Sequence, residues 1–85
     1  MNIENENKNE WWSIELNKNG VLVNNLFILR AERKISQKEL AYQVGVSRQT
    51  IASIEANRYN PSLILAFEIS AFFNKEIYEV FQYKL

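Results

Sequence analysis

Three polar side chains at helical spacing, Arg48, Gln49 and Ser53, are the strongest candidates for chemistry in this 85-residue sequence. An arginine can donate two hydrogen bonds to the edge of a guanine, and a glutamine can form a matching pair with adenine. The three residues fall on one short polar face of a predicted helix that begins after Ser47. This pattern predicts a helix that reads the base edges of DNA.

The preceding residues predict a second helix that joins the first through a tight turn. Ser36 is suited to cap this helix, Glu39 would complete a capping box, and Gly45 supplies the left-handed residue on which a helix can end. Val46 is apolar within the turn and is expected to contact the core. Two short helices joined in this way are typical of a helix-turn-helix module. An ordinary helical hairpin with a polar surface is the alternative, but the combination of signals favours DNA binding.

From Asn24 to Gln82 the sequence resembles the Xre/Cro, lambda-repressor-like helix-turn-helix family. The resemblance rests on the segments LRAERKISQKELA, QVGVSRQTIASIE and NRYNPSLILAFEIS. The flanking segments VLVNNLFILR and EVFQY resemble those of short stand-alone repressors of Gram-positive bacteria. The resemblance implies a five-helix bundle that dimerises and places one recognition helix per subunit in the major groove.

The resemblance also implies roles for individual residues. The residues that would face bases are Arg48, Gln49 and Ser53. Those that would contact the DNA backbone are Gln37, Ser47, Asn57 and Arg58. Arg30 and Glu55 would form a buried ion pair. Glu55 shares the apolar face of its helix, so burial would require a partner, whereas two solvated surface charges are the alternative.

Composition limits the possible classes of protein. The length suits one domain with a modest core, without room for a separate enzymatic cleft. The sequence holds no cysteine and no histidine, so it predicts no disulfide, no metal site, no cofactor and no enzyme. No apolar run approaches the ~20 residues of a membrane span, and the N-terminus does not resemble a signal peptide. We therefore expect a cytoplasmic protein that does not contact a membrane.

Charge is unevenly distributed along a chain whose formal net charge is zero. Residues 21–60 hold six basic and three acidic residues, a net charge of +3, whereas residues 1–20 carry −2 and residues 61–85 carry −1. The positive excess coincides with the helix-turn-helix. Because it is small, non-specific affinity for DNA should be weak, and specificity should depend on a few placed contacts.

The predicted fold is mainly α, a five-helix lambda-repressor-like domain with a small antiparallel sheet built from the N- and C-terminal segments. The chain divides into a disordered tail (1–10), a β-hairpin extension (11–23) and the helix-turn-helix domain with a C-terminal strand (24–85). Asn19 and Gly20 are a strong hairpin signal. Residues 80–84 are the candidate third strand beside Val21–Val23. A disordered arm with a strand only at 21–23 is the alternative.

The remaining helices are placed by their caps. Asn24 or Asn25 would start the first helix, which runs to about Lys34, and a short last helix runs from about Lys75 to Tyr78 or Val80. Ser62 would cap a helix that ends near Phe73 and is more apolar than one buried stripe requires. Its predicted stripe is Leu63, Ala66, Ile69 and Phe73. Three further apolar residues, left on other faces, are Ile64, Phe67 and Phe72. They indicate an additional buried surface, either a dimer interface in the C-terminal half or the seat of the hairpin.

The leading functional hypothesis is a sequence-specific, homodimeric transcriptional regulator, a repressor that reads a near-palindromic operator in double-stranded DNA. An antitoxin or anti-activator that acts mainly through a protein partner is the alternative. Trp11 and Trp12 in the N-terminal extension favour that alternative, because tryptophan is a common interface anchor. No motif identifies an inducing ligand.

Overall fold

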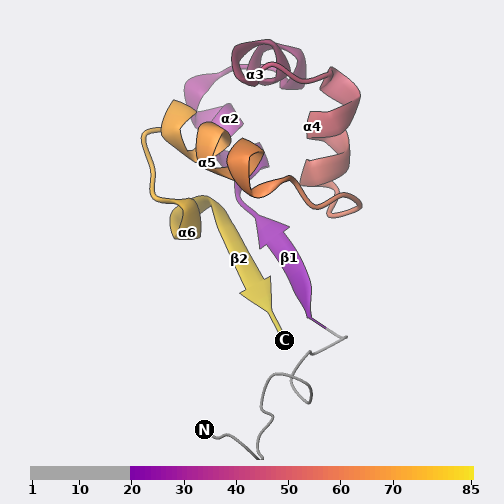
Figure 1. Ribbon diagram of the computed structural model, residues 1–85. Coiled ribbons are helices and arrows are strands. Elements are labelled where there is room, and N and C mark those ends of the chain that lie inside the picture. Colours follow the sequence, from indigo (N-terminus) through magenta and orange to yellow (C-terminus); the bar gives the residue numbers. More distant parts are fainter. Residues whose placement is uncertain (1–19) are drawn as a thin grey trace, which may run out of the picture.

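The computed structural model describes residues 20–85, which form five helices and two strands. In chain order the elements are β1 (Val21–Asn24), α2 (Leu26–Arg33), α3 (Gln37–Val44), α4 (Arg48–Glu55), α5 (Leu63–Phe72), α6 (Ile77–Val80) and β2 (Phe81–Lys84). The helices pack around one another, and the two strands form a ribbon that extends away from them (Figure 1). The mainly α fold with a small antiparallel sheet is therefore confirmed.

Serine side chains fix the start of three helices. The hydroxyls of Ser36, Ser47 and Ser62 each accept a hydrogen bond from the backbone N–H three residues later, at 3.0, 3.1 and 3.1 Å respectively. Loss of such a cap typically costs ~1 kcal/mol. Only half of the predicted capping box at Ser36 forms: the Ser36 hydroxyl accepts from the Glu39 N–H, whereas the Glu39 carboxylate accepts from the Gln43 side chain at 2.9 Å.

The side chains of two asparagines, Asn24 and Asn25, form hydrogen bonds at the start of α2. Asn25 occupies the cap position, but its side chain donates to the Glu79 carbonyl at 2.8 Å. The side chain of Asn24 instead accepts from the Leu26 N–H at 3.0 Å. Because Glu79 belongs to α6, these contacts connect the first helix to the C-terminal segment.

Helix α3 ends at Gly45, as predicted, in the left-handed conformation with φ of 76°. Lys34, Asn57 and Asn74 adopt similar conformations, with φ of 57°, 60° and 59°. Asparagine tolerates this region because its short side chain can hydrogen-bond locally, whereas lysine has no such advantage. Glycine has no Cβ and enters the region at little cost.

Gly45→Ala is expected to lower the free energy of unfolding by about 1–2 kcal/mol, the usual cost of a left-handed L-residue. A Cβ added at Gly45 would meet no atom within 4 Å, so the loss should come from the backbone alone. Urea melts would measure the change. Lys34→Gly is the matched control and should stabilise the protein, because it relieves the same conformation. A Gly45→Ala protein as stable as the wild type would contradict the left-handed turn.

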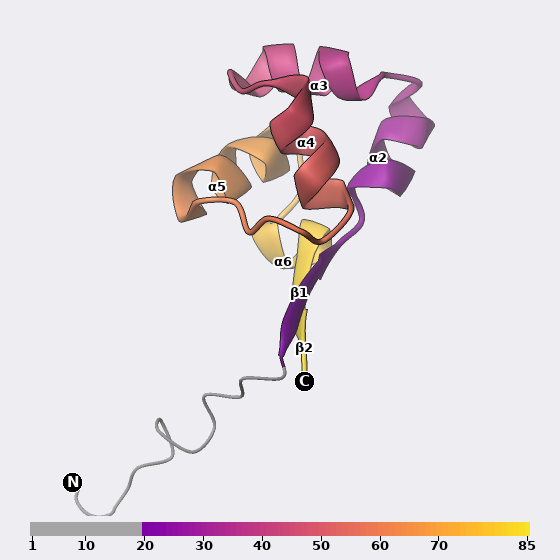
Figure 2. The same cartoon turned by 90° about the vertical axis from the view of Figure 1, so that its right-hand side faces the viewer.

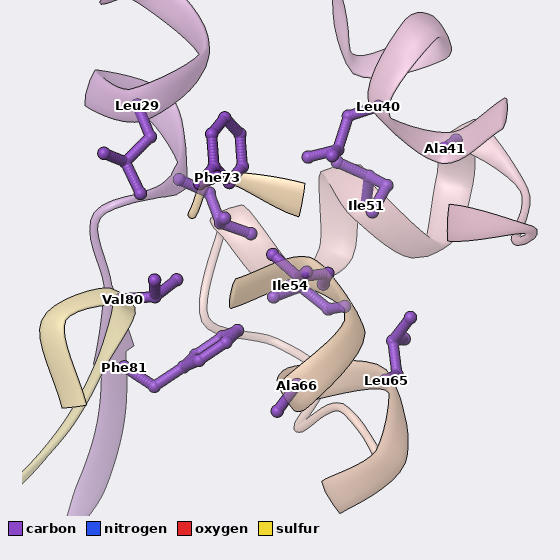
Figure 3. Packing of buried hydrophobic residues seen from close by; sticks show 12 residues of the cluster. Leu29, Leu40, Ala41, Ile51, Ile54, Leu65, Ala66, Phe73, Val80 and Phe81 are labelled. Carbon is purple, nitrogen blue, oxygen red and sulfur yellow. The ribbon is translucent and has the colours of Figure 1, made fainter. Parts of the chain in front are cut away.

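The core lies among the helices and draws on all five of them and on β2. Its fully buried side chains are Leu26, Leu40, Ile51, Ile54, Ile69 and Val80. Figure 3 shows Leu40 of α3 beside Ile51 of α4, and Phe81 of β2 below them with its ring turned toward the interior. Val46, in the turn between α3 and α4, is half-buried and packs against this cluster, as predicted.

The predicted buried stripe of α5 is partly wrong. Ala66, Ile69 and Phe73 are buried as expected, but the first buried position is Leu65, and Leu63 is 69 % exposed. The helix is apolar on nearly every side, so periodicity alone does not identify the face that packs. Ser70 is also buried, and its hydroxyl donates to the Ala66 carbonyl at 2.8 Å.

Strands β1 and β2 pair antiparallel, with Leu22 opposite Tyr83 and Asn24 opposite Phe81. The predicted pairing of the two terminal segments is thereby confirmed. The Asn25 N–H also donates to the Val80 carbonyl at 3.0 Å, which continues the connection to the start of α2. The predicted disordered tail and the first strand of the predicted hairpin lie outside the described residues.

Candidate nucleic-acid interface

Helix α4 stands at one side of the helical domain, joined to α3 by the turn from Gly45 to Ser47. The Val46 N–H donates to the Ala41 carbonyl at 3.0 Å and closes this turn. Ile51 and Ile54 anchor α4 in the core, with exposures of 0 % and 1 %. The other side of the helix therefore faces outward, and Figure 2 shows α4 in front of the remaining helices.

The three predicted base-reading residues lie on this outward part of α4. Arg48 and Gln49 form the first turn of the helix and are exposed, whereas Ser53, in the second turn, is half-buried. Because buried residues of the same helix fix its position, these side chains extend from a rigid element. Rigid presentation suits the narrow geometric tolerance of base-edge hydrogen bonds.

The four predicted backbone-contact residues flank this helix. Ser47 precedes α4, Gln37 is the first residue of α3, and Asn57 and Arg58 follow α4. Ser47, Asn57 and Arg58 are exposed, and Gln37 is half-buried. The Ser47 hydroxyl, besides capping α4, lies 3.0 Å from the Thr50 hydroxyl. The structure thus places these residues at three points around the outward helix.

Asn57 has a structural role that sequence analysis missed. Its side-chain oxygen accepts a hydrogen bond from the Asn24 side chain at 3.1 Å, and the same Asn24 amide donates to the Ile54 carbonyl at 2.9 Å. These bonds connect the end of α4 to the junction of β1 and α2. The tolerance of asparagine for φ above zero is a signal in the sequence for the turn itself, but nothing local identifies Asn24 as the partner.

Arg30 of α2 and Glu55 at the end of α4 form a bidentate ion pair. The Arg30 Nε donates to Glu55 Oε2 at 2.6 Å, and Nη2 donates to Oε1 at 3.0 Å. The side chains are 13 % and 9 % exposed. Arg30 also donates from Nη1 to the Ile35 carbonyl at 3.0 Å. The hydrogen bond to Glu55 raises the pKa of Arg30 against the opposing effect of burial.

Gln37 joins this pair to the outward end of α4. Its Nε2 donates to Glu55 Oε1 at 3.1 Å, and its Oε1 accepts from Arg48 Nη1 at 2.8 Å. Sequence analysis assigned Gln37 only a contact to DNA. Because Gln37 and Arg48 begin two different helices, no spacing rule within one helix predicts their contact.

Not every basic residue of the helix-turn-helix region is available to DNA. Arg30 is paired with Glu55, and Arg33 donates to the Phe72 carbonyl at 2.9 Å. The Arg33 guanidinium also lies over the Phe72 and Phe73 rings, at 5.1 and 5.2 Å from their centroids. The exposed basic residues that remain between 21 and 60 are Lys34, Lys38, Arg48 and Arg58. The electrostatic attraction to phosphates is correspondingly modest.

Two other kinds of feature, a metal site and a membrane-spanning helix, lack support among residues 20–85. Within this range, no three His, Cys, Asp or Glu side chains gather as a metal site would require. None of the helices in the same range is long and apolar enough to span a membrane.

A short helix held outward on a core-anchored turn defines a helix-turn-helix DNA-binding module. The helix-turn-helix family profile matches residues 26–80, which is well over half of the chain. The chain belongs to this family, in its Xre or lambda-repressor-like branch.

Two relatives illustrate the similarity in sequence. A regulator of Methanocaldococcus jannaschii, described as an uncharacterised HTH-type transcriptional regulator, is 48 % identical over 61 residues, covering 72 % of this chain and 92 % of its own. The immunity repressor protein of Bacillus phage phi105 is 51 % identical over 35 residues, covering 41 % of this chain and 24 % of its own.

Two solved structures illustrate the similarity in fold. A protein of Bacteroides fragilis has a TM-score of 0.66 at 24 % identity, covering 73 % of this chain and all of that one. The restriction-modification controller protein C.AhdI of Aeromonas hydrophila has a TM-score of 0.59 at 28 % identity, covering 64 % of this chain and 78 % of that one. The family profile and the sequence relatives together show a DNA-binding transcriptional regulator of the helix-turn-helix type.

Proposed function

We propose that the protein is a homodimeric repressor that acts in the cytoplasm and reads a near-palindromic operator, with α4 of each subunit in the major groove. The observation that carries the proposal is the exposed first turn of α4, where Arg48 and Gln49 extend from a helix anchored by Ile51 and Ile54. The similarity to a phage immunity repressor supports the proposal that the protein represses transcription rather than activating it.

Specific contacts are divided between bases and backbone. Arg48 is suited to guanine and Gln49 to adenine, each through two hydrogen bonds, with Ser53 beside them one turn further along α4. The phosphate contacts would come from Gln37, Ser47, Asn57 and Arg58. Backbone contacts of this kind fix the register of the protein on the duplex without carrying sequence information.

The outward face of α5 supports dimerisation through the C-terminal half. Leu63, Ile64 and Phe67 lie near one another on this helix and are 69 %, 72 % and 53 % exposed. Scattered exposed apolar residues are ordinary, but three within the first two turns of one helix resemble an interaction surface. A second copy of the chain is the proposed occupant, because two recognition helices are needed to read two half-sites.

Replacement of Arg48 or Gln49 by alanine is expected to weaken operator binding and to relax the preference for one base position. A good two-hydrogen-bond contact discriminates between bases by roughly 1–3 kcal/mol. The operator would first be selected from randomised duplex DNA by the wild-type protein. Fluorescence anisotropy with this duplex and its single-base variants would then measure both effects.

Gln43→Ala is the control, because Gln43 is exposed on α3 and bonds only to Glu39 among the contacts described above. It should leave affinity and base preference unchanged. If Arg48→Ala and Gln49→Ala both preserved operator affinity, the outward end of α4 would not be the reading surface.

A further inference from the structure

A chain of hydrogen-bonded side chains leads from the interior of the domain to the proposed reading surface. Arg30 of α2 binds Glu55 at the end of α4, Glu55 binds Gln37 at the start of α3, and Gln37 binds Arg48 at the start of α4. Exposure increases outward from Glu55: its side chain is 9 % exposed, Gln37 is half-buried and Arg48 is exposed.

The chemistry of the two neighbours dictates the orientation of the Gln37 amide. An ionised carboxylate only accepts hydrogen bonds, so Glu55 must receive the Nε2 of Gln37. The Oε1 of Gln37 then points away from Glu55, toward Arg48. A guanidinium only donates hydrogen bonds, so it requires the acceptor at that place. Glutamine can therefore connect an acceptor-only group to a donor-only group.

The hydrogen bond with Gln37 restrains the Arg48 side chain but leaves most of its N–H donors free to bind DNA. A guanidinium has five N–H donors, and the bond to Gln37 uses one of those on Nη1. Enough donors remain for two hydrogen bonds to a guanine edge. A free arginine side chain at an exposed helix start would have to be ordered when DNA binds, at a cost in conformational entropy. Restraint before binding reduces that cost and narrows the directions in which Arg48 can point.

We propose that Glu55 is a positioning residue for base recognition, which acts through Gln37 to hold the Arg48 guanidinium in place before DNA arrives. The inference rests on the proposed function, namely base reading by Arg48. It goes beyond a phosphate contact for Gln37, since a phosphate contact would strengthen binding to every sequence alike. Positioning of Arg48 should instead sharpen the preference for one base.

The test compares base discrimination, measured as the ratio of affinities for the selected operator and for the duplex altered at the position that Arg48→Ala relaxes. A good arginine contact gives a ratio of about 5 to 150. Gln37→Met and Glu55→Gln should each reduce this ratio by about threefold or more, within the range that one such contact supplies. Gln43→Met makes the same change of side chain on the same helix and should leave the ratio unchanged.

The double variants separate positioning from general damage. In an Arg48→Ala background, neither Gln37→Met nor Glu55→Gln should change the ratio further, because the side chain that they position is gone. A uniform loss of affinity with an unchanged ratio would overturn the inference and leave Gln37 as a phosphate contact. An Arg48→Ala protein with full discrimination would instead refute the proposed function itself.

A measurement without DNA keeps the inference testable if Glu55→Gln does not fold. The Gln37 side chain carries no charge, so Gln37→Met leaves the Arg30–Glu55 ion pair intact and exposes no unpaired buried charge. NMR relaxation of the Arg48 Nε–Hε group should show restricted motion in the wild type and faster, wider motion in Gln37→Met. Equal mobility of Arg48 in the two proteins would overturn the positioning role.

Discussion

Arg30→Met is expected to lower the free energy of unfolding by about 3–5 kcal/mol, the range typical of a buried ion pair that loses one partner. The substitution would leave the Glu55 carboxylate, 9 % exposed, without its two hydrogen bonds from the guanidinium. It would also remove the donor to the Ile35 carbonyl. Because small domains have total stabilities of about 5–15 kcal/mol, this loss would bring the protein close to unfolding at 37 °C.

Urea melts of Arg30→Met, Glu55→Gln and the double variant would measure the coupling between the partners. The double variant should be more stable than the sum of the single losses implies, because it contains no unpaired buried charge. Lys38→Met, at an exposed position of α3, is the control and should change stability by less than about 0.5 kcal/mol. Single losses below that same value for Arg30 and Glu55 would mean that the pair is solvated.

The parts of the fold that were predicted correctly depend on local chemistry. Serine caps at Ser36, Ser47 and Ser62 and the left-handed end at Gly45 follow from contacts within a few residues along the chain. The pairing of β1 with β2 joins distant segments. It was still predictable, because both segments have the composition of strands and the C-terminal segment was the candidate partner for residues 21–23. For each of these features the sequence allows few alternative local structures, so the pattern of residues was sufficient to predict it.

The errors arose where the sequence permits several packings. Helix α5 is apolar nearly all round, so its face is decided by the neighbouring helices, which bury Leu65 and leave Leu63 exposed. The tertiary contacts of Asn24 with Asn57 and of Gln37 with Arg48 cross between elements. Periodicity within one element does not predict such contacts, because they depend on how β1, α3 and α4 are placed relative to one another.

In the candidate site, too, the features within one helix were predictable from the sequence, whereas the contacts between helices were not. Spacing within α4 was enough to bring Arg48 and Gln49 to one exposed turn. The partnership of Arg30 with Glu55 came from the family resemblance, since nothing in the local pattern connects residues on two separate helices. The contacts of Gln37 with Glu55 and Arg48 were not predicted, because they join side chains on different helices and required the structure.

The operator itself should respond strongly to a change in its spacing. Two recognition helices of a dimer reach half-sites about 34 Å apart, or one turn of the duplex. Insertion of five base pairs turns one half-site to the opposite face of the DNA, where a fixed dimer cannot contact both. Affinity should fall by about 10²–10⁴-fold, the usual gain from linking two binding events. Anisotropy titrations with the two duplexes would measure it, and a change of spacer sequence at constant length is the control.

Ile64→Glu tests the same dimer from the side of the protein. A carboxylate on the outward face of α5, where Ile64 is 72 % exposed, should resist burial against a second copy while leaving the domain folded. Sedimentation should then show a monomer, and affinity for the full operator should fall toward that for a single half-site. Ile28→Glu, the same change at an exposed position of α2, should leave the dimer intact. If the five-base-pair insertion and Ile64→Glu both left affinity unchanged, the protein would read DNA as a monomer, and the apolar face of α5 would have another partner.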